Sequence, residues 1–150
     1  MKHIRVAVLS GLVLMFGACG SSRLTWNING FWGAGLNNPD GSPAFAFSMN
    51  LTQGSGTAVN VANFSFVPAP SCFPSSTGQS VVFTATGSSN GNVTGSFAMS
   101  ISTLFPGALN NVLSLQGDRN ATGRISGTWT LTGQSGCTGT TGTFLMSLPV

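Results

Sequence analysis

Residues 124–132, RISGTWTLT, alternate apolar side chains with hydroxyl-bearing and charged ones. On an extended chain, Ile125, Trp129 and Leu131 lie on one face, and the polar side chains of the stretch lie on the other. A period of two is typical of a half-buried β-strand. The stretch therefore predicts one strand of a sheet that has a single apolar face.

The same pattern recurs in NVTGSFAMS (92–100) and GTTGTFLMS (139–147), and Gly30-Phe31-Trp32 is a weaker fourth copy. The three full copies share a hydroxyl residue, Gly, a second hydroxyl residue, an aromatic residue and then Met or Leu. In a strand, the Gly and the aromatic residue two positions later face the same side. We therefore predict that each Gly leaves space which an aromatic ring of a neighbouring strand covers, and this would explain glycine inside strands that it otherwise weakens.

Stretches in which apolar residues alternate with small or polar ones, separated by turn-forming residues, extend over the chain. This pattern predicts an all-β fold. The expected architecture is an antiparallel up-and-down meander of about eight strands, forming a closed or nearly closed barrel, with a β-sandwich as the alternative. Apolar residues change phase between Val61 and Phe64, which predicts a bulge near Ala62-Asn63. Strands are expected at about 24–32, 44–52 and 57–67 and then around Val81, Phe97, Leu113, Ile125 and Phe144; only 107–115 could form a short helix instead.

Connections of two lengths separate these strands. In a meander, the loops after odd-numbered strands share one end, and the longer connections 33–43, 68–78, 105–111 and 133–141 all follow odd strands. The other end carries short turns. We expect bulky side chains to fill the interior, and recognition to lie in the long loops, with Phe73 and Phe105 as candidate ligand-binding residues.

The N-terminus predicts export and lipidation. Basic residues precede an apolar run from Val6 to Phe16, which is too short to span a bilayer. The ending Phe16-Gly17-Ala18-Cys19 resembles the lipobox of bacterial lipoproteins. This resemblance, which covers residues 1–22, implies that 1–18 form a helical signal peptide and that Cys19 carries diacylglycerol. Residues 19–23 would then form the lipidated start and a short tether, and the strand pattern predicts one β domain over 24–150. In that family, Gly20 implies delivery to the outer membrane; the alternative is an incidental Cys19 in an ordinary secretory signal.

Two further cysteines, Cys72 and Cys137, remain after cleavage in an oxidising compartment, and a disulfide between them is the default interpretation. A disulfide that closes this loop of about 65 residues would stabilise the folded chain by roughly 4 kcal/mol in the chain-entropy model. Two buried thiols are the alternative.

The mature chain lacks most of the side chains that act in catalysis, and this argues against an enzyme. It contains no His, Lys, Glu or Tyr, which leaves only Asp40 and Asp118 as acids or bases. Both aspartates lie in turn-like contexts and are expected to form turns. We predict no metal site, no cofactor and no nucleic-acid binding, because imidazoles and a basic cluster are missing.

Gly30-Phe31-Trp32 also resembles the G-x-W motif near the start of lipocalins, which implies an eight-stranded barrel. Together these features indicate a non-enzymatic binding module, anchored in the outer membrane, that presents its long loops away from the membrane. Its partner would be a small apolar ligand, a glycan or another envelope protein. The alternative is a structural lipoprotein of the cell envelope without a specific ligand.

Overall fold

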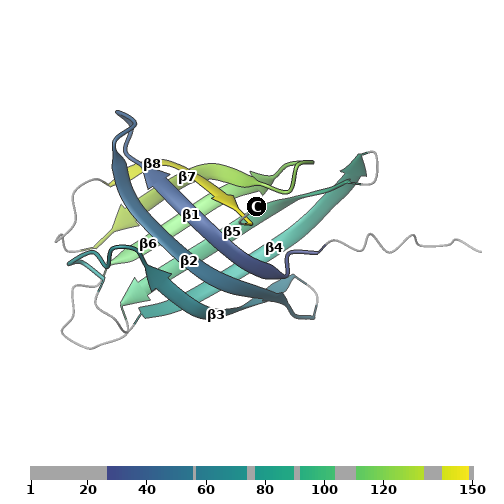
Figure 1. The fold of residues 1–150 in the computed structure, drawn as a ribbon, viewed down its shortest axis with the longest axis horizontal. Helices are drawn as coiled ribbons and strands as arrows, with labels where there is room; N and C mark the ends of the chain where they lie inside the picture. Colours follow the sequence, from purple (N-terminus) through teal and green to yellow (C-terminus); the bar gives the residue numbers. More distant parts are fainter. Residues whose placement is uncertain are drawn as a thin grey trace, which may run out of the picture.

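The computed structural model describes residues 27–55, 57–73, 77–89, 92–103, 111–133 and 140–148. Within these ranges, eight antiparallel strands follow one another and close into a barrel (Figure 1). The predicted up-and-down barrel is confirmed, and the sandwich alternative is wrong because β8 pairs with β1. The strands are β1 (Gly30–Asn37), β2 (Pro43–Gln53), β3 (Ala58–Phe66), β4 (Thr77–Ser89), β5 (Asn92–Thr103), β6 (Val112–Arg119), β7 (Ile125–Thr132) and β8 (Thr141–Ser147).

The first strand differs in its bounds from the sequence prediction. The first strand spans Gly30–Asn37 rather than 24–32, and 24–26 lie outside the described residues. Small residues that resemble a loop, such as Gly33 and Gly35, are held in β1 by ladders to β2 on one side and to β8 on the other. The strand predicted around Leu113 is confirmed as β6, and the alternative of a short helix at 107–115 is wrong in its described part. No helix long and apolar enough to cross a membrane occurs among the described residues.

Bulky side chains fill the interior, as predicted. Every strand turns its apolar face inward, and these faces join into one continuous core. Ile28 enters the barrel at the end where β1 begins, and its carbonyl accepts a 2.8 Å hydrogen bond from Trp32 Nε1. Gly30 follows with φ +138°, a conformation that other residues rarely adopt, and turns the chain from this cap into β1. Residues 27–30 thus close one end of the barrel.

Glycines inside the strands make room for aromatic rings, and this confirms the interpretation of the repeat at Gly95 and Gly142, whereas a Cβ at Gly127 would meet the backbone of β6. One row across the sheet reads Phe97, Gly117, Gly127 and Phe144 on four successive strands. The two phenylalanine rings approach each other over the glycines, with centroids 6.5 Å apart. A Cβ at Gly117 would meet the Phe144 ring, and one at Gly95 would meet the Phe83 ring. Glycine is therefore required here by close approach rather than by backbone freedom.

The bulge predicted near Ala62-Asn63 is confirmed. Asn50 pairs with Ala62 while Ser48 pairs with Ser65, so β3 contains one residue more than β2 over this step. Asn63 has φ 53°, in the left-handed region that Asn tolerates better than most residues. The extra residue restores the inward direction of the next apolar positions, Phe64 and Phe66.

Two glycine substitutions, one in β5 and one in β1, test whether glycine is needed where an aromatic ring approaches the backbone. We expect Gly95→Ala to destabilise the barrel by about 1–3 kcal/mol, because its Cβ would meet both the Phe83 ring and the carbonyl oxygen of Thr84. The matched control is Gly35→Ala, where nothing lies within 4 Å of the added Cβ, and its effect should stay within about 0.5 kcal/mol. Urea unfolding monitored by circular dichroism measures both. Equal effects of the two substitutions would contradict the argument.

Candidate functional site

The two ends of the barrel differ, although less than the sequence predicted. The connection after β1 is the tight turn 38–42 rather than a long loop at 33–43. The connections after β3, β5 and β7 are longer, and the strand ends that they join lie at the opposite end of the barrel from the start of β1 (Figure 1). Three of the four predicted long connections therefore remain, and we call this the long-loop end. The first strand begins at the short-turn end, as the alternation of strand direction requires.

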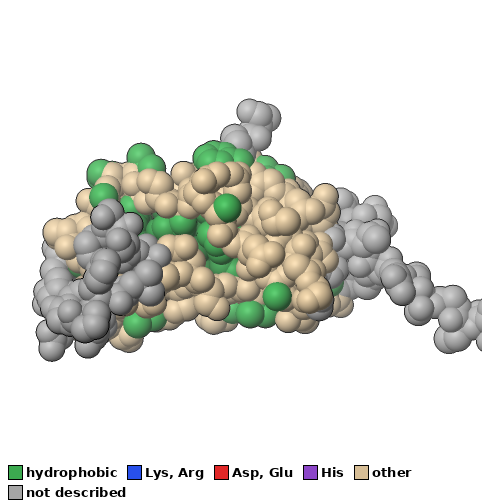
Figure 2. All heavy atoms as spheres, turned by 90° about the horizontal axis from the view of Figure 1, so that it is seen from below, with side chains coloured by type: hydrophobic (Ala, Val, Ile, Leu, Met, Phe, Trp, Pro, Cys, Tyr) green, Lys and Arg blue, Asp and Glu red, His purple; other side chains and the backbone are tan. Residues whose placement is uncertain are grey.

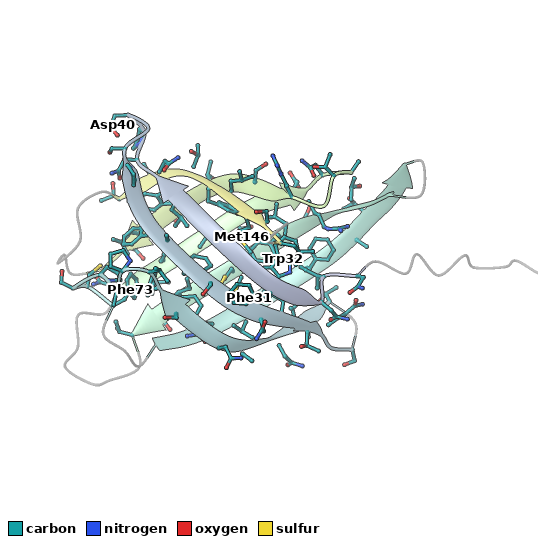
Figure 3. All side chains as sticks on the ribbon, viewed as in Figure 1. Phe31, Trp32, Asp40, Phe73 and Met146 are labelled. Carbon is teal, nitrogen blue, oxygen red and sulfur yellow. The ribbon has the colours of Figure 1, made fainter. Side chains whose placement is uncertain are left out.

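A segment of the β3–β4 connection closes the long-loop end. Phe73 is 1% exposed and packs against Phe45 and Phe66, with ring centroids 6.3 and 5.2 Å away. Cys72 is also buried, and its carbonyl oxygen accepts a 3.1 Å hydrogen bond from the amide nitrogen of buried Asn111. Figure 3 shows Phe73 at this end of the barrel. Phe73, a candidate ligand-binding residue of the long loops, therefore has its ring in the core rather than at the surface.

The remaining predicted site residues lie mostly outside the described ranges. Cys19, Phe105 and Cys137 are among them, so lipidation, ligand binding at Phe105 and the cysteine pairing stay predictions. Cys72 itself is disulfide-bonded. Asn111 was not anticipated, because nothing in the sequence around it indicates that its side chain is buried.

The two aspartates lie at opposite ends of the barrel. Asp40 forms the predicted turn: its Oδ1 accepts hydrogen bonds from the Ser42 hydroxyl at 2.6 Å and the Ser42 backbone N–H at 2.9 Å. These two bonds lower the pKa of the carboxyl group below its ordinary value.

Asp118 lies in β6 instead of a turn and accepts a hydrogen bond from the Ser96 hydroxyl at 3.1 Å. The turn that follows is organised by the side chain of Asn120, which accepts from Thr122 and Arg124.

Charged side chains are few among the described residues: Asp40, Asp118, Arg119 and Arg124. Arg119 occupies an inward-facing position at the end of β6. Its partial burial lowers the pKa of its guanidinium. Within the described ranges, no three His, Cys, Asp or Glu side chains gather closely enough to hold a metal ion.

Among the described strands, β3 and β4 share the shortest ladder of the barrel, and we call the boundary between these two strands the β3–β4 seam. Their ladder consists of Ala58 with Val82 and Val59 with Val81, whereas β4 pairs with β5 from Thr77 to Ser89. Beyond Val59, β3 has no ladder partner on β4 among the described residues. Viewed from below Figure 1, where β3 and β4 lie, the surface shows hydrophobic side chains in a hollow (Figure 2).

Aromatic side chains of β3 lie at this seam. Phe64 and Phe66 are only half-buried, although they face the core. The Phe64 ring lies 5.2 Å from Phe47 and 5.1 Å from Phe66, and the Phe66 ring stacks on Phe73. The seam therefore combines an open strand edge with accessible aromatic rings, and it is the candidate functional site. The phase change at Ala62-Asn63 was its signal in the sequence, because a bulge disturbs pairing where it occurs.

Comparisons with known proteins identify no relative. No protein-family model matches the chain, and neither the curated proteins nor the solved structures contain a significant match.

Replacement of Phe73 tests whether the β3–β4 connection is part of the core. We expect Phe73→Ala to lower the free energy of unfolding by about 3–5 kcal/mol, because a buried ring leaves a cavity next to Phe45 and Phe66. Phe31→Ala is the control, since its ring is 47% exposed and its loss should cost far less. Denaturant unfolding under oxidising conditions measures both. A cost below that of Phe31→Ala would show that the connection does not plug the barrel.

Proposed function

We propose that this chain is a lipid-anchored protein of the bacterial cell envelope that binds an extended segment of another envelope protein. The β3–β4 seam is the observation that carries the proposal. Beyond Val59, the edge of β3 offers backbone N–H and C=O groups that β4 does not pair in the described ladder. An added strand can satisfy such groups, and this is a common mode of peptide recognition.

The side chains at the seam favour a strand over a compact apolar ligand. A strand with alternating apolar and small polar residues would cover Phe64 and Phe66 with one face and continue the hydroxyl-rich outer surface with the other. A small apolar molecule would cover the rings but would leave the backbone groups of β3 to water. Hydrogen bonds would then contribute affinity, and the phenylalanine rings would select the alternate side chains.

The proposal retains a non-enzymatic role and the outer-membrane location. Its support is the lipobox-like ending at Cys19 and the small number of titratable groups in the mature chain. The β domain begins at the short-turn end, where a lipid on Cys19 would be joined to it. We also propose that Cys72 pairs with Cys137, which would fix the β3–β4 connection against the β7–β8 connection at the long-loop end.

A structural role is the second candidate, and the closed interior favours it. Ile28 and Phe73 fill the two ends of the barrel, and the space between them is occupied by side chains of one continuous core. Such a domain could space or coat the envelope without a specific partner.

Lipidation is tested by the intact mass of the chain purified from the membranes of a Gram-negative host. The expected product lacks residues 1–18 and carries diacylglycerol and further acyl mass on Cys19. The variant Cys19→Ser should lose the acyl mass and should no longer remain with the membrane. A product cleaved elsewhere, with an unmodified thiol at Cys19, would contradict the anchor while leaving the fold unaffected.

Photo-crosslinking in the intact envelope tests the seam. A benzoylphenylalanine at position 64 should give a discrete protein adduct, because Phe64 lies at the open edge. The same group at Thr128, an exposed position of β7, serves as the control. Thermal unfolding of both variants confirms that each is folded. An adduct of small mass at position 64 would indicate a small apolar ligand instead, and no enrichment over position 128 would favour the structural role.

A further inference from the structure

A hydrophobic surface lies on the outside of the barrel, away from the seam. We define the β1–β8 face as Phe31, Gly33, Gly35, Leu145 and Leu148. Phe31, Leu145 and Leu148 are 47%, 47% and 42% exposed, and they make up three of the five large hydrophobic side chains exposed among the described residues. Soluble surfaces carry single exposed hydrophobic residues commonly, but a gathering of them indicates an interaction site.

The face is hollowed because two of its residues are glycines. Gly33 and Gly35 have nothing within 4 Å of a Cβ added to them, so the backbone of β1 forms the floor of a groove. Phe31 and Leu145 stand beside this floor, and the groove has a volume of about 550 Å³. The side chains that line it are uncharged. An apolar chain could lie in this groove without removing a charge from water.

A second groove adjoins the first and supplies a cation. It has a volume of about 440 Å³, shares Ser147 with the first groove, and is lined by Arg124 and by Leu148 of the β1–β8 face. Arg124 is exposed, and an arginine guanidinium matches the geometry of a phosphate group. Asp118, the described carboxylate near this end, is directed to Ser96 of β5 and lines neither groove. The two grooves thus present an apolar stretch followed by one positive charge.

The position of the face indicates what covers it. Leu148 lies beside Gly30, where β1 begins at the short-turn end. Cys19 precedes Asn27, the first described residue, by eight residues, which span at most about 28 Å when extended. A lipid on Cys19 would therefore keep Asn27, and the end of the β1–β8 face beside Gly30, within about 28 Å of the bilayer.

We infer that the β1–β8 face binds a phospholipid of the membrane in which Cys19 is anchored. An acyl chain lies along Gly33 and Gly35 between Phe31 and Leu145, and the phosphate group lies beside Arg124. This inference rests on the proposed lipid anchor. It places the barrel on its side against the bilayer rather than upright on its tether.

Quenching of tryptophan fluorescence by brominated lipids tests the inference. The lipidated protein is reconstituted into vesicles of phosphatidylethanolamine and phosphatidylglycerol with bromine on the acyl chains. The reporter is Phe31→Trp, and the control is Val82→Trp, which places the same ring at an exposed position of β4 on the opposite side of the barrel. After subtraction of the wild-type signal, emission from position 31 should be quenched several-fold more than emission from position 82. Adding Arg124→Gln to the reporter should reduce this difference.

Two outcomes would overturn the inference. Equal quenching at positions 31 and 82 in vesicle-bound protein would show that the face does not contact lipid. Weak quenching at position 31 together with a dimer in native mass spectrometry would assign the face to a second copy of the chain. Failure of the anchor itself is recognised separately, because the protein would then not sediment with the vesicles. In that case Cys19→Ser, carrying each reporter in turn, tests the face alone at high lipid concentration.

Discussion

The narrow interior of an eight-stranded barrel is the constraint on which the rest of this structure depends. Such a barrel is just wide enough for its own side chains, so large rings can enter only where neighbouring positions are empty. The row that joins Phe97 and Phe144 across Gly117 and Gly127 meets this constraint directly. Trp129 follows the same rule, because its ring lies over Gly142 and its indole N–H donates to the Asn37 carbonyl at 2.9 Å. The large rings fit inside the closed sheet because glycines on neighbouring strands leave room for them.

Side-chain periodicity predicted most of this fold because it reports directly on which face is buried. The number of strands, the inward direction of the aromatic residues and the bulge at Asn63 all follow from it. It failed for β1, where Gly33 and Gly35 have no side chains to report burial and are held by ladders on both sides. It failed for Phe73 because proline-rich flanks resemble a surface loop, whereas the segment folds back into the barrel. The phase change at Ala62-Asn63 indicated the bulge, but not that β3 would lose its pairing with β4 rather than with β2, since pairing between strands is a property of the closed sheet.

The open seam is a consequence of the same bulge that keeps β3 in phase. An extra residue allows Phe64 and Phe66 to face the core, but it also bends the strand and increases its twist. On the β2 side the ladder recovers, and it continues as far as a hydrogen bond from the Val67 N–H to the Ala46 carbonyl at 2.8 Å. On the β4 side it does not recover within the described residues. One local irregularity thus accounts for both the aromatic packing at the long-loop end and the exposed strand edge.

The closed order of strands relates the two proposed surfaces. In a ring of eight strands, β4 lies opposite β8, so the seam between β3 and β4 lies on the other side of the barrel from the β1–β8 face. If the β1–β8 face rests on lipid, the seam is turned away from the bilayer, where an extended segment of another protein can reach it. An upright barrel would instead leave the groove at Gly33 and Gly35 in water, with Phe31 and Leu145 exposed beside it. Burial of these apolar side chains favours the lateral orientation, because each would otherwise remain hydrated next to a membrane that could cover it.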